Sequence, residues 1–262
     1  MDMGLQGKCA LVMASSSGLG KAIATELSRE GANVMLFSRN ADELKVAQAA
    51  IEKETGNRPE YFSGSITNYN DIKRLIKTTV ETFGPIYALV NNTGGPKPGK
   101  FDAFQDEDWQ DAYELCLLSY IRTIREVLPY MKSNGGGRII NSTSSSVKAV
   151  LDNLILSNTF RMGVMGLSKT LSQELGKDNI MVNVIGPGRV GTARIDYLDK
   201  IRAEKTGKTV ASVQEEAWAT IPVGRYGTLD EYGRLAAFLC SATNTFITGQ
   251  TVLLDGGMVK AY

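Results

Sequence analysis

Residues 9–20 read CALVMASSSGLG, a short apolar run followed by a turn of serine and glycine. A buried strand that ends in such a turn and starts a helix directs backbone N–H groups and the positive helix end at one point, which suits a pyrophosphate. The relevant positions are Ala14, Gly18 and Gly20. Two glycines after a strand also occur in ordinary strand-to-helix turns, so this stretch alone leaves both readings open.

Further β-rich runs follow at intervals and alternate with segments of helical spacing. They are NVMLFS (33–38), the weaker EYFSG (60–64), YALVNN (87–92), RIINST (138–143), IMVNVI (180–185) and TVLLDG (251–256). This alternation predicts an α/β fold, a doubly wound parallel sheet with helices on both faces. No linker or repeat interrupts it, so residues 1–262 are expected to form a single Rossmann-like domain. The polar stretch 191–222 shows no strand signal and is predicted to be a mobile insertion that covers the ligand.

The composition narrows the functional classes. With 29 basic and 28 acidic residues, net charge +1, the chain has no evident surface for nucleic acid or an anionic membrane. The N-terminal residues resemble neither a signal peptide nor a spanning helix, so a cytoplasmic protein is expected. The three cysteines are far apart and are expected to be reduced. Because there is no histidine, no metal site is predicted, and proton transfer must use another group.

The residue after the second strand bears on the choice of nucleotide. A carboxylate there would hold the ribose hydroxyls of NAD, whereas a basic residue favours the 2′-phosphate of NADP. This chain has Ser38 and Arg39. We therefore expect NADP, with NAD possible, since an arginine can meet a phosphate with paired N–H donors. The alternative is that Arg39 is simply a solvated surface residue.

Several motifs together resemble the short-chain dehydrogenase/reductase family over nearly the whole chain. MASSSGLG (13–20) is similar to the family's TGxxxGxG, NNTGG (91–95) to its NNAG, and GPG (186–188) to its PG motif. IPVGRYGTLDE (221–231) and FITGQTVLLDGG (246–257) are similar to its C-terminal signature. The nearest branches are the 3-oxoacyl-carrier-protein reductases and the glucose dehydrogenases. The resemblance implies a seven-stranded Rossmann-like fold, a nicotinamide cofactor, a small-molecule substrate and a homotetramer.

The resemblance also implies which residues contact the cofactor. These are Ala14, Ser16, Ser17, Gly18, Leu19, Gly20, Arg39, Ser65, Ile66, Asn92, Thr93, Gly94, Arg161, Pro187, Gly188 and Val190. Two of them depart from the family pattern, since Ala14 replaces its first glycine and Ser65 its usual aspartate.

The family's catalytic Asn, Ser, Tyr and Lys are largely replaced. Matching GVMGLSKTLSQELG (163–176) to the helix that follows the catalytic lysine places Arg161 at the Lys position and Ser157 at the Tyr position. Ser144, thirteen residues before Ser157, retains the serine, and Cys116 falls at the Asn position. A serine hydroxyl is shorter and far less acidic than a phenol, so Ser157 cannot act as that tyrosine does. Arg161 stays charged and cannot pass a proton.

Other groups could replace the missing ones. Tyr113 and Tyr120 share a helix face with Cys116 and could supply a phenol, although packing in the core or at a subunit interface is the alternative. Lys148 and Asp152 lie in the loop before Ser157, which lines the substrate pocket in the family, but they could equally be solvated. Lys97 and Arg189 follow strand ends. With Lys148 and Arg161 they suggest an electropositive pocket for a carboxylate or phosphate.

Three functions follow as hypotheses. The first is an NADP(H)-dependent oxidoreductase acting on a carbonyl or alcohol, with Cys116, Ser144, Ser157 and Arg161 as its catalytic set, because the cofactor carries the hydride and the protein supplies mainly orientation. The second is a nucleotide-binding protein without redox activity, a sensor or a non-catalytic partner. The third is a non-redox enzyme acting on an anionic substrate.

Overall fold

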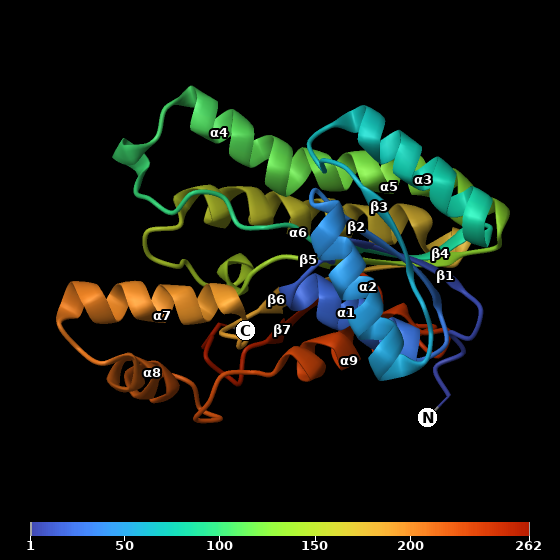
Figure 1. Cartoon of the computed structure of the whole chain (residues 1–262). Helices are drawn as coiled ribbons and strands as arrows, with labels where there is room; N and C mark the ends of the chain where they lie inside the picture. The colour runs from blue at the N-terminus through green and yellow to red at the C-terminus, as the bar shows by residue number, and fades with distance from the viewer. Residues whose placement is uncertain (1, 262) are drawn as a thin grey trace.

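The computed structural model describes residues 2–261, and within them the strands form one seven-stranded parallel sheet in the order β3-β2-β1-β4-β5-β6-β7 (Figure 1). The strands are β1 (Cys9–Met13), β2 (Asn33–Ser38), β3 (Glu60–Ser63), β4 (Ile86–Asn91), β5 (Gly137–Ser142), β6 (Ile180–Pro187) and β7 (Thr251–Leu254). The predicted doubly wound sheet is confirmed, including the weaker third strand. The chain reverses direction across the sheet between β1 and β4, which is where α/β proteins bind ligands.

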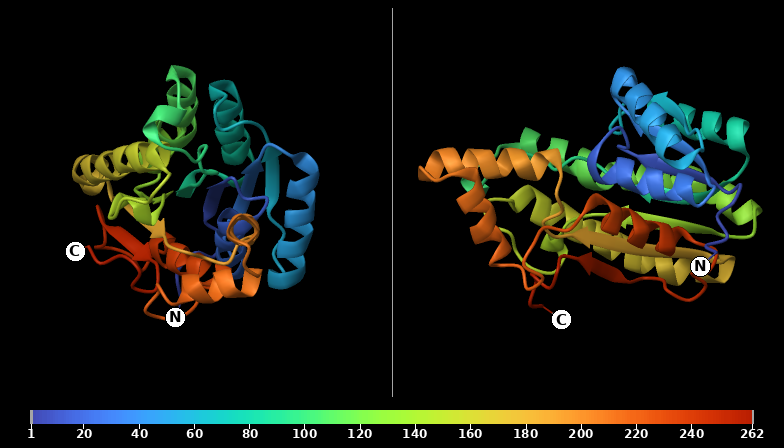
Figure 2. Two further views of the ribbon diagram at one scale, coloured as in Figure 1. Left: turned by 90° about the vertical axis from the view of Figure 1, so that its left-hand side faces the viewer. Right: turned by 60° about the horizontal axis from the view of Figure 1, so that its bottom comes forward.

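Helices cover both faces of the sheet (Figures 1 and 2). On one face, α1 (Gly18–Arg29), α2 (Ala41–Thr55) and α9 (Leu229–Cys240) pack against Ala10 and Val12 of β1. On the other, α3 (Tyr69–Phe83), α5 (Ser119–Ser133) and α6 (Ile155–Leu175) pack against Leu11 and Met13. Alternate residues of a strand point to opposite faces, so a strand buried on both sides is apolar throughout.

Local sequence sets the limits of α2, with a cap at one end and a glycine at the other. The Asn40 side chain accepts hydrogen bonds from the amides of Asp42 (2.9 Å) and Glu43 (3.3 Å), which caps the first turn. Gly56 ends the helix at φ +78°, a left-handed conformation that glycine adopts without a Cβ clash. In α6, Val164, Leu167, Leu171 and Leu175 form an apolar stripe, of which Val164 and Leu175 are buried and Leu167 and Leu171 only partly covered.

The stretch 191–222, predicted from its polar composition to be a mobile insertion, contains two helices. It folds into α7 (Ala193–Thr206) and α8 (Val210–Trp218), capped by Thr192 and Thr209, with Gly207 at φ +66° between them. Neither helix was predicted; α7 is polar around most of its circumference and shows little apolar periodicity. Both project beyond the end of the sheet (Figures 1 and 2), opposite α4 (Asp106–Tyr113).

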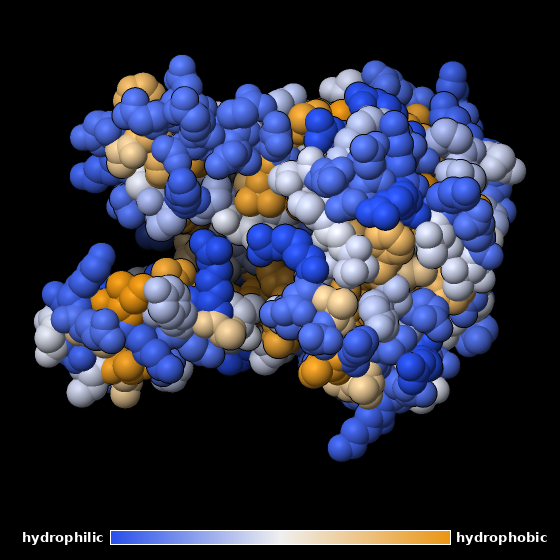
Figure 3. Space-filling view, turned by 45° about the horizontal axis from the view of Figure 1, so that its top comes forward, coloured by the Kyte–Doolittle hydropathy of each residue, from blue (hydrophilic) through white to orange (hydrophobic). Residues whose placement is uncertain are grey.

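The surface is hollowed between the side that carries α4 and the side that carries α7 (Figure 3). This hollow lies beyond the carboxyl ends of the strands. Among residues 2–261, no helix is both long enough and apolar enough to cross a membrane.

Candidate functional site

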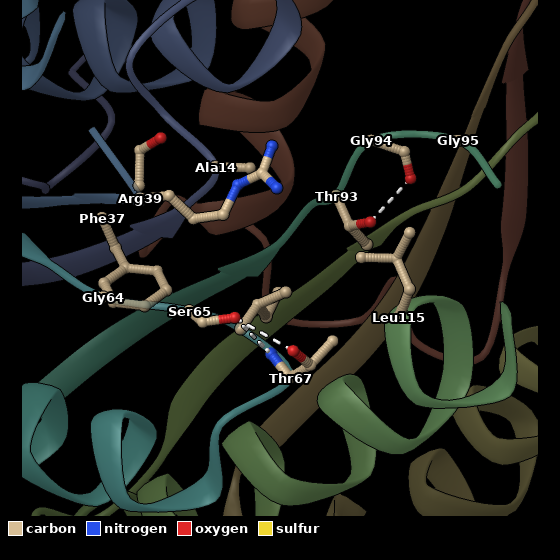
Figure 4. Close-up of a pocket in the computed structure, with 12 residues that line it drawn as sticks. Ala14, Phe37, Arg39, Gly64, Ser65, Thr67, Thr93, Gly94, Gly95 and Leu115 are labelled. Carbon is tan, nitrogen blue, oxygen red and sulfur yellow. Dashed lines mark hydrogen bonds between the residues drawn. The ribbon is translucent and has the colours of Figure 1, made fainter. Parts of the chain in front are cut away.

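A cavity of about 350 Å³ opens at the carboxyl ends of β1, β2, β3 and β4 (Figure 4). Its walls come from four separate loops that the parallel sheet brings to one edge. The lining residues are Ala14, Phe37, Ser38, Arg39, Gly64, Ser65, Ile66, Thr67, Thr93, Gly94, Gly95 and Leu115. Six of these, Ala14, Arg39, Ser65, Ile66, Thr93 and Gly94, are among the residues expected from sequence to bind the cofactor.

The turn after β1 is built for close backbone contact. A Cβ at Gly20 would lie 2.2 Å from the Ala14 carbonyl oxygen, so no other residue fits there without a shift. Gly18 has φ +55° and starts α1, and the preceding Ser17 makes no side-chain cap. The first amides of α1 therefore remain available to an anion.

Ala14 is strained at the same turn. Its φ is +48°, a left-handed conformation that costs an L-residue roughly 1–2 kcal/mol. Asn92, which directly follows β4, contacts this turn: its side-chain amide lies 3.3 Å from the Ala14 carbonyl oxygen. The alanine is thus tolerated sterically but held at an energetic cost.

Arg39 is exposed and extends over the cavity (Figure 4). Among the described residues it makes no ion pair, in contrast to many arginines and lysines of this chain. Ser16, expected to face the same ligand, instead bonds the hydroxyl of Ser38 and the carboxylate of Glu43, both at 3.1 Å. Arg39 is therefore the cation best placed for a phosphate at this end of the cavity.

Ser65 is fixed by neighbours within its own loop. Its amide donates to the Asp71 carboxylate (2.9 Å) and its hydroxyl lies 3.0 Å from that of Thr67. The Ser65 amide, together with Arg74, lowers the pKa of Asp71. Asp71 anchors this loop through the Ser65 amide. Ser65 can therefore present its hydroxyl to the cavity, at the position where the family has an aspartate.

The four residues expected from sequence to be catalytic, Cys116, Ser144, Ser157 and Arg161, differ in exposure. The Ser144 hydroxyl accepts a hydrogen bond from the Ser146 amide (3.1 Å) at the start of a short 3-10 turn. Ser157 is in the first turn of α6 and only 7% exposed. Cys116 is buried within a π-helical turn, Glu114–Leu118, where its burial raises the thiol pKa, with Arg161 opposing the shift. Buried in this way, it is a poor nucleophile.

Arg161 is 4% exposed and bound to backbone oxygens. Its guanidinium donates to the carbonyls of Ser142 (3.2 Å) and Gly94 (3.4 Å), so it joins the ends of β5 and β4. Burial lowers the pKa of Arg161, but the nearby Tyr120 and Cys116 raise it by more, so the side chain remains a cation.

The two tyrosines proposed as substitute phenols differ in their surroundings. Tyr120 is fully buried, its hydroxyl donates to the Ser142 carbonyl (2.6 Å), and burial raises its pKa to about 12. Tyr113 is half-buried and its ring packs on Phe160, with 6.0 Å between ring centroids. The structure therefore supports the packing alternative for Tyr120, whereas a role for the Tyr113 phenol stays a prediction.

The electropositive pocket expected from sequence involves four cations, of which two pair with carboxylates. Lys97 is 2.6 Å from the Asp108 carboxylate, and Arg189 is 3.5 Å from that of Asp199. Lys148 and Asp152 are exposed on their loop, whereas Arg161 is buried. A shared pocket for an anionic group of the substrate therefore stays a prediction.

The remaining expected cofactor contacts are three residues at the end of β6 and Leu19 of α1. Gly188 donates its amide to the Leu254 carbonyl (2.9 Å), and a Cβ there would lie 2.6 Å from that of Asp255. Pro187 ends β6 and Val190 is buried. Leu19 is partly buried in α1. None of the four lines the cavity.

Sequence reasoning missed Arg194, in the first turn of α7. Its guanidinium packs on Gly95, where an added Cβ would lie 3.0 Å from Nη2. A basic residue two positions after the cap Thr192 was the available signal. Among residues 2–261, no three Asp, Glu or Cys side chains group so as to hold a metal ion.

Comparison with known proteins places this geometry in a family. Residues 13–259 match the family model described as Enoyl-(Acyl carrier protein) reductase. Nodulation protein G of Rhizobium sp. (strain N33) is 34% identical over 256 residues, 97% of this chain and 98% of that protein. The 3-oxoacyl-(acyl-carrier-protein) reductase FabG of Thermotoga maritima is 30% identical over 259 residues, 98% of this chain and 100% of that protein.

The solved structures agree. L-sorbose reductase from Gluconobacter frateurii, complexed with NADPH and L-sorbose, superposes with a TM-score of 0.95 at 31% identity, over 100% of both chains. The sequence motifs, the sheet order, the cavity at its switch point and these relatives have one explanation: the chain belongs to the short-chain dehydrogenase/reductase family, as a member similar to the 3-oxoacyl-acyl-carrier-protein reductases.

Proposed function

We propose that this protein is an NADP(H)-dependent oxidoreductase that acts on a carbonyl or alcohol substrate. The observation that carries the proposal is the unpaired Arg39 beside a cavity at the sheet's switch point. Relatives whose structures are described as containing NADPH, such as the sorbose reductase, support the same nucleotide.

The residues present fit NADP. Arg39 would hold the 2′-phosphate, and the free amides at Gly18 and Gly20 would hold the diphosphate. Ser65 and Ile66 would border the adenine, with Thr93 and Gly94 further along the cavity. The bound cofactor would supply the hydride.

The protein's own groups would orient the carbonyl. Since the Ser144 oxygen accepts from the Ser146 amide, its O–H remains free to donate to a substrate oxygen. Ser157 offers a second hydroxyl, for which the described residues provide no hydrogen-bond partner. The buried Arg161 would contribute positive charge without transferring a proton. Water would deliver the proton. Cys116 would fill the space left by the family's asparagine.

A protein that binds the nucleotide without redox chemistry is the second candidate. It is favoured by one observation: Tyr120 is buried and bound to the Ser142 carbonyl, so it does not take the place of the missing phenol. The proton relay would then be absent while the cavity and Arg39 are retained.

One titration separates the two. The protein is titrated with NADPH and with NADH while nicotinamide fluorescence is followed, and ketones, 3-oxoacyl thioesters and sugar acids are then added. The oxidoreductase binds NADPH more tightly and loses signal on substrate addition. Binding without turnover favours the second candidate, and failure to bind either nucleotide refutes both.

We also propose that the protein forms a homotetramer in which a second copy covers the face between α5 and α6. An apolar groove there is lined by Ile121, Ile124, Leu128, Pro129, Leu167 and Leu171. Leu167 and Leu171 continue the stripe of α6 but are left only partly covered. Light scattering after gel filtration should give four times the chain mass, and L171E should reduce it. A wild-type monomer would contradict the proposal.

A further inference from the structure

Two arginines approach the exposed Gly94–Gly95 segment, which follows β4 in the chain. Arg161 comes from α6 and donates to the Gly94 carbonyl, whereas Arg194 comes from α7 and packs on Gly95. Both glycines are exposed, at the carboxyl end of the central strand β4. Elements far apart in sequence thus place two guanidinium groups at adjoining residues.

Neither arginine has a counter-charge. Among residues 2–261, no carboxylate forms an ion pair with Arg161 or Arg194. The ionisable groups that act on Arg161 are Tyr120, Cys116 and Tyr232, all neutral at pH 7 because burial raises their pKa values. Arg161 is buried, and a buried cation without a paired anion is costly, whereas Arg194 is exposed.

The backbone between them is also unpaired. Within the described part of the chain, the amides of Gly94 and Gly95 donate no hydrogen bond. The Gly94 carbonyl is already occupied by the Thr93 hydroxyl (2.7 Å) and Arg161. The segment therefore offers donors rather than acceptors, as anion-binding backbone does.

We propose that Arg161, Arg194 and the amides of Gly94 and Gly95 form an oxyanion site, hereafter the two-arginine site. Its ligand is a phosphoryl or carboxylate group. Two sources would present that chemistry, the diphosphate of the cofactor or an acidic group on the substrate. The turn expected to hold the diphosphate is near this segment of α7, since a Cβ built on Gly18 would lie 4.0 Å from Thr192. Only the choice of source rests on the proposed function.

The test uses inorganic sulfate as the probe. Thermal unfolding of the full chain is followed from 0 to 20 mM sulfate, with chloride keeping the ionic strength constant. The wild type should show a saturable rise in Tm, because an anion that binds only the folded state stabilises it. In R194Q the sulfate concentration for half the shift should rise about tenfold, the effect of losing one charge-assisted hydrogen bond. R161K keeps the charge but loses the paired N–H donors of the guanidinium. Its sulfate concentration for half the shift should therefore lie between those of the wild type and R194Q.

K200Q is the matched control, since Lys200 is an exposed cation on the same helix and its loss changes net charge equally. It should respond as the wild type does, which also accounts for the general stabilising effect of sulfate. A wild-type response no larger than with chloride alone overturns the two-arginine site. An R194Q response equal to that of K200Q overturns it as well.

A second arm identifies the source by repeating the titration at saturating NADP⁺. If the nucleotide abolishes the sulfate response and R194Q weakens NADP⁺ about tenfold, the site takes the cofactor's diphosphate. If the response persists and NADP⁺ affinity is unchanged, the site takes an acidic group on the substrate. Should the protein bind no NADP⁺, the proposed function fails, while the nucleotide-free arm still decides the two-arginine site.

Discussion

Replacing Ala14 by glycine should stabilise this protein, the reverse of what most alanine-to-glycine changes do. Ala14 is held at φ +48°. Relief of left-handed strain is worth roughly 1–2 kcal/mol, and the greater freedom of glycine in the unfolded chain costs about 0.5–1 kcal/mol. The net gain is about 1 kcal/mol, or a Tm rise of roughly 2–4 °C for a chain of this size. Ala14 is only partly buried, so losing its methyl sacrifices little packing.

The measurement is thermal unfolding of A14G beside A49G. Ala49 is exposed in the middle of α2, where glycine has no strain to relieve and should destabilise by about 1 kcal/mol. The two variants should therefore shift Tm in opposite directions. An A14G protein that melts below the wild type by as much as A49G does would refute the assignment of strain to this turn. NADPH affinity should not fall in A14G, because the cavity loses only a methyl group.

Three further outcomes are expected. R39Q should weaken NADPH about 10- to 100-fold by removing a charge-assisted contact while NADH binding stays constant, and equal losses for both nucleotides would count against the 2′-phosphate assignment. S144A should lower turnover about 100-fold with unchanged NADPH affinity, whereas unaltered turnover would remove Ser144 from the mechanism. Glu231, paired with Arg225, has its pKa lowered to about 2, so its contribution to stability is complete above its ordinary pKa and is lost as pH falls toward 2. The Tm difference between wild type and E231Q should accordingly shrink from pH 5 to pH 2; a constant difference would rule out this linkage.

Local sequence was sufficient where neighbouring residues alone decide the structure. Alternating strand and helix patterns predicted the parallel sheet, because a strand buried on both faces must be apolar throughout. Asn40 and Gly56 marked the limits of α2, since a cap bonds amides within the same turn. Ala14, Gly18 and Gly20 marked the turn after β1. By contrast, α7 and α8 were not predicted, since α7 is too polar to show a helical period and α8 spans only nine residues.

The sequence by itself determined the fold and the place of the cavity, because these depend on residue type and spacing along the chain. Only the tertiary structure decided which charges remain available. Lys97 and Arg189 are neutralised by Asp108 and Asp199, whereas Arg194 lies beside Gly95 without a counter-charge. Electrostatic interaction depends on distance through space, and residues that adjoin in the folded chain can be a hundred positions apart in the sequence.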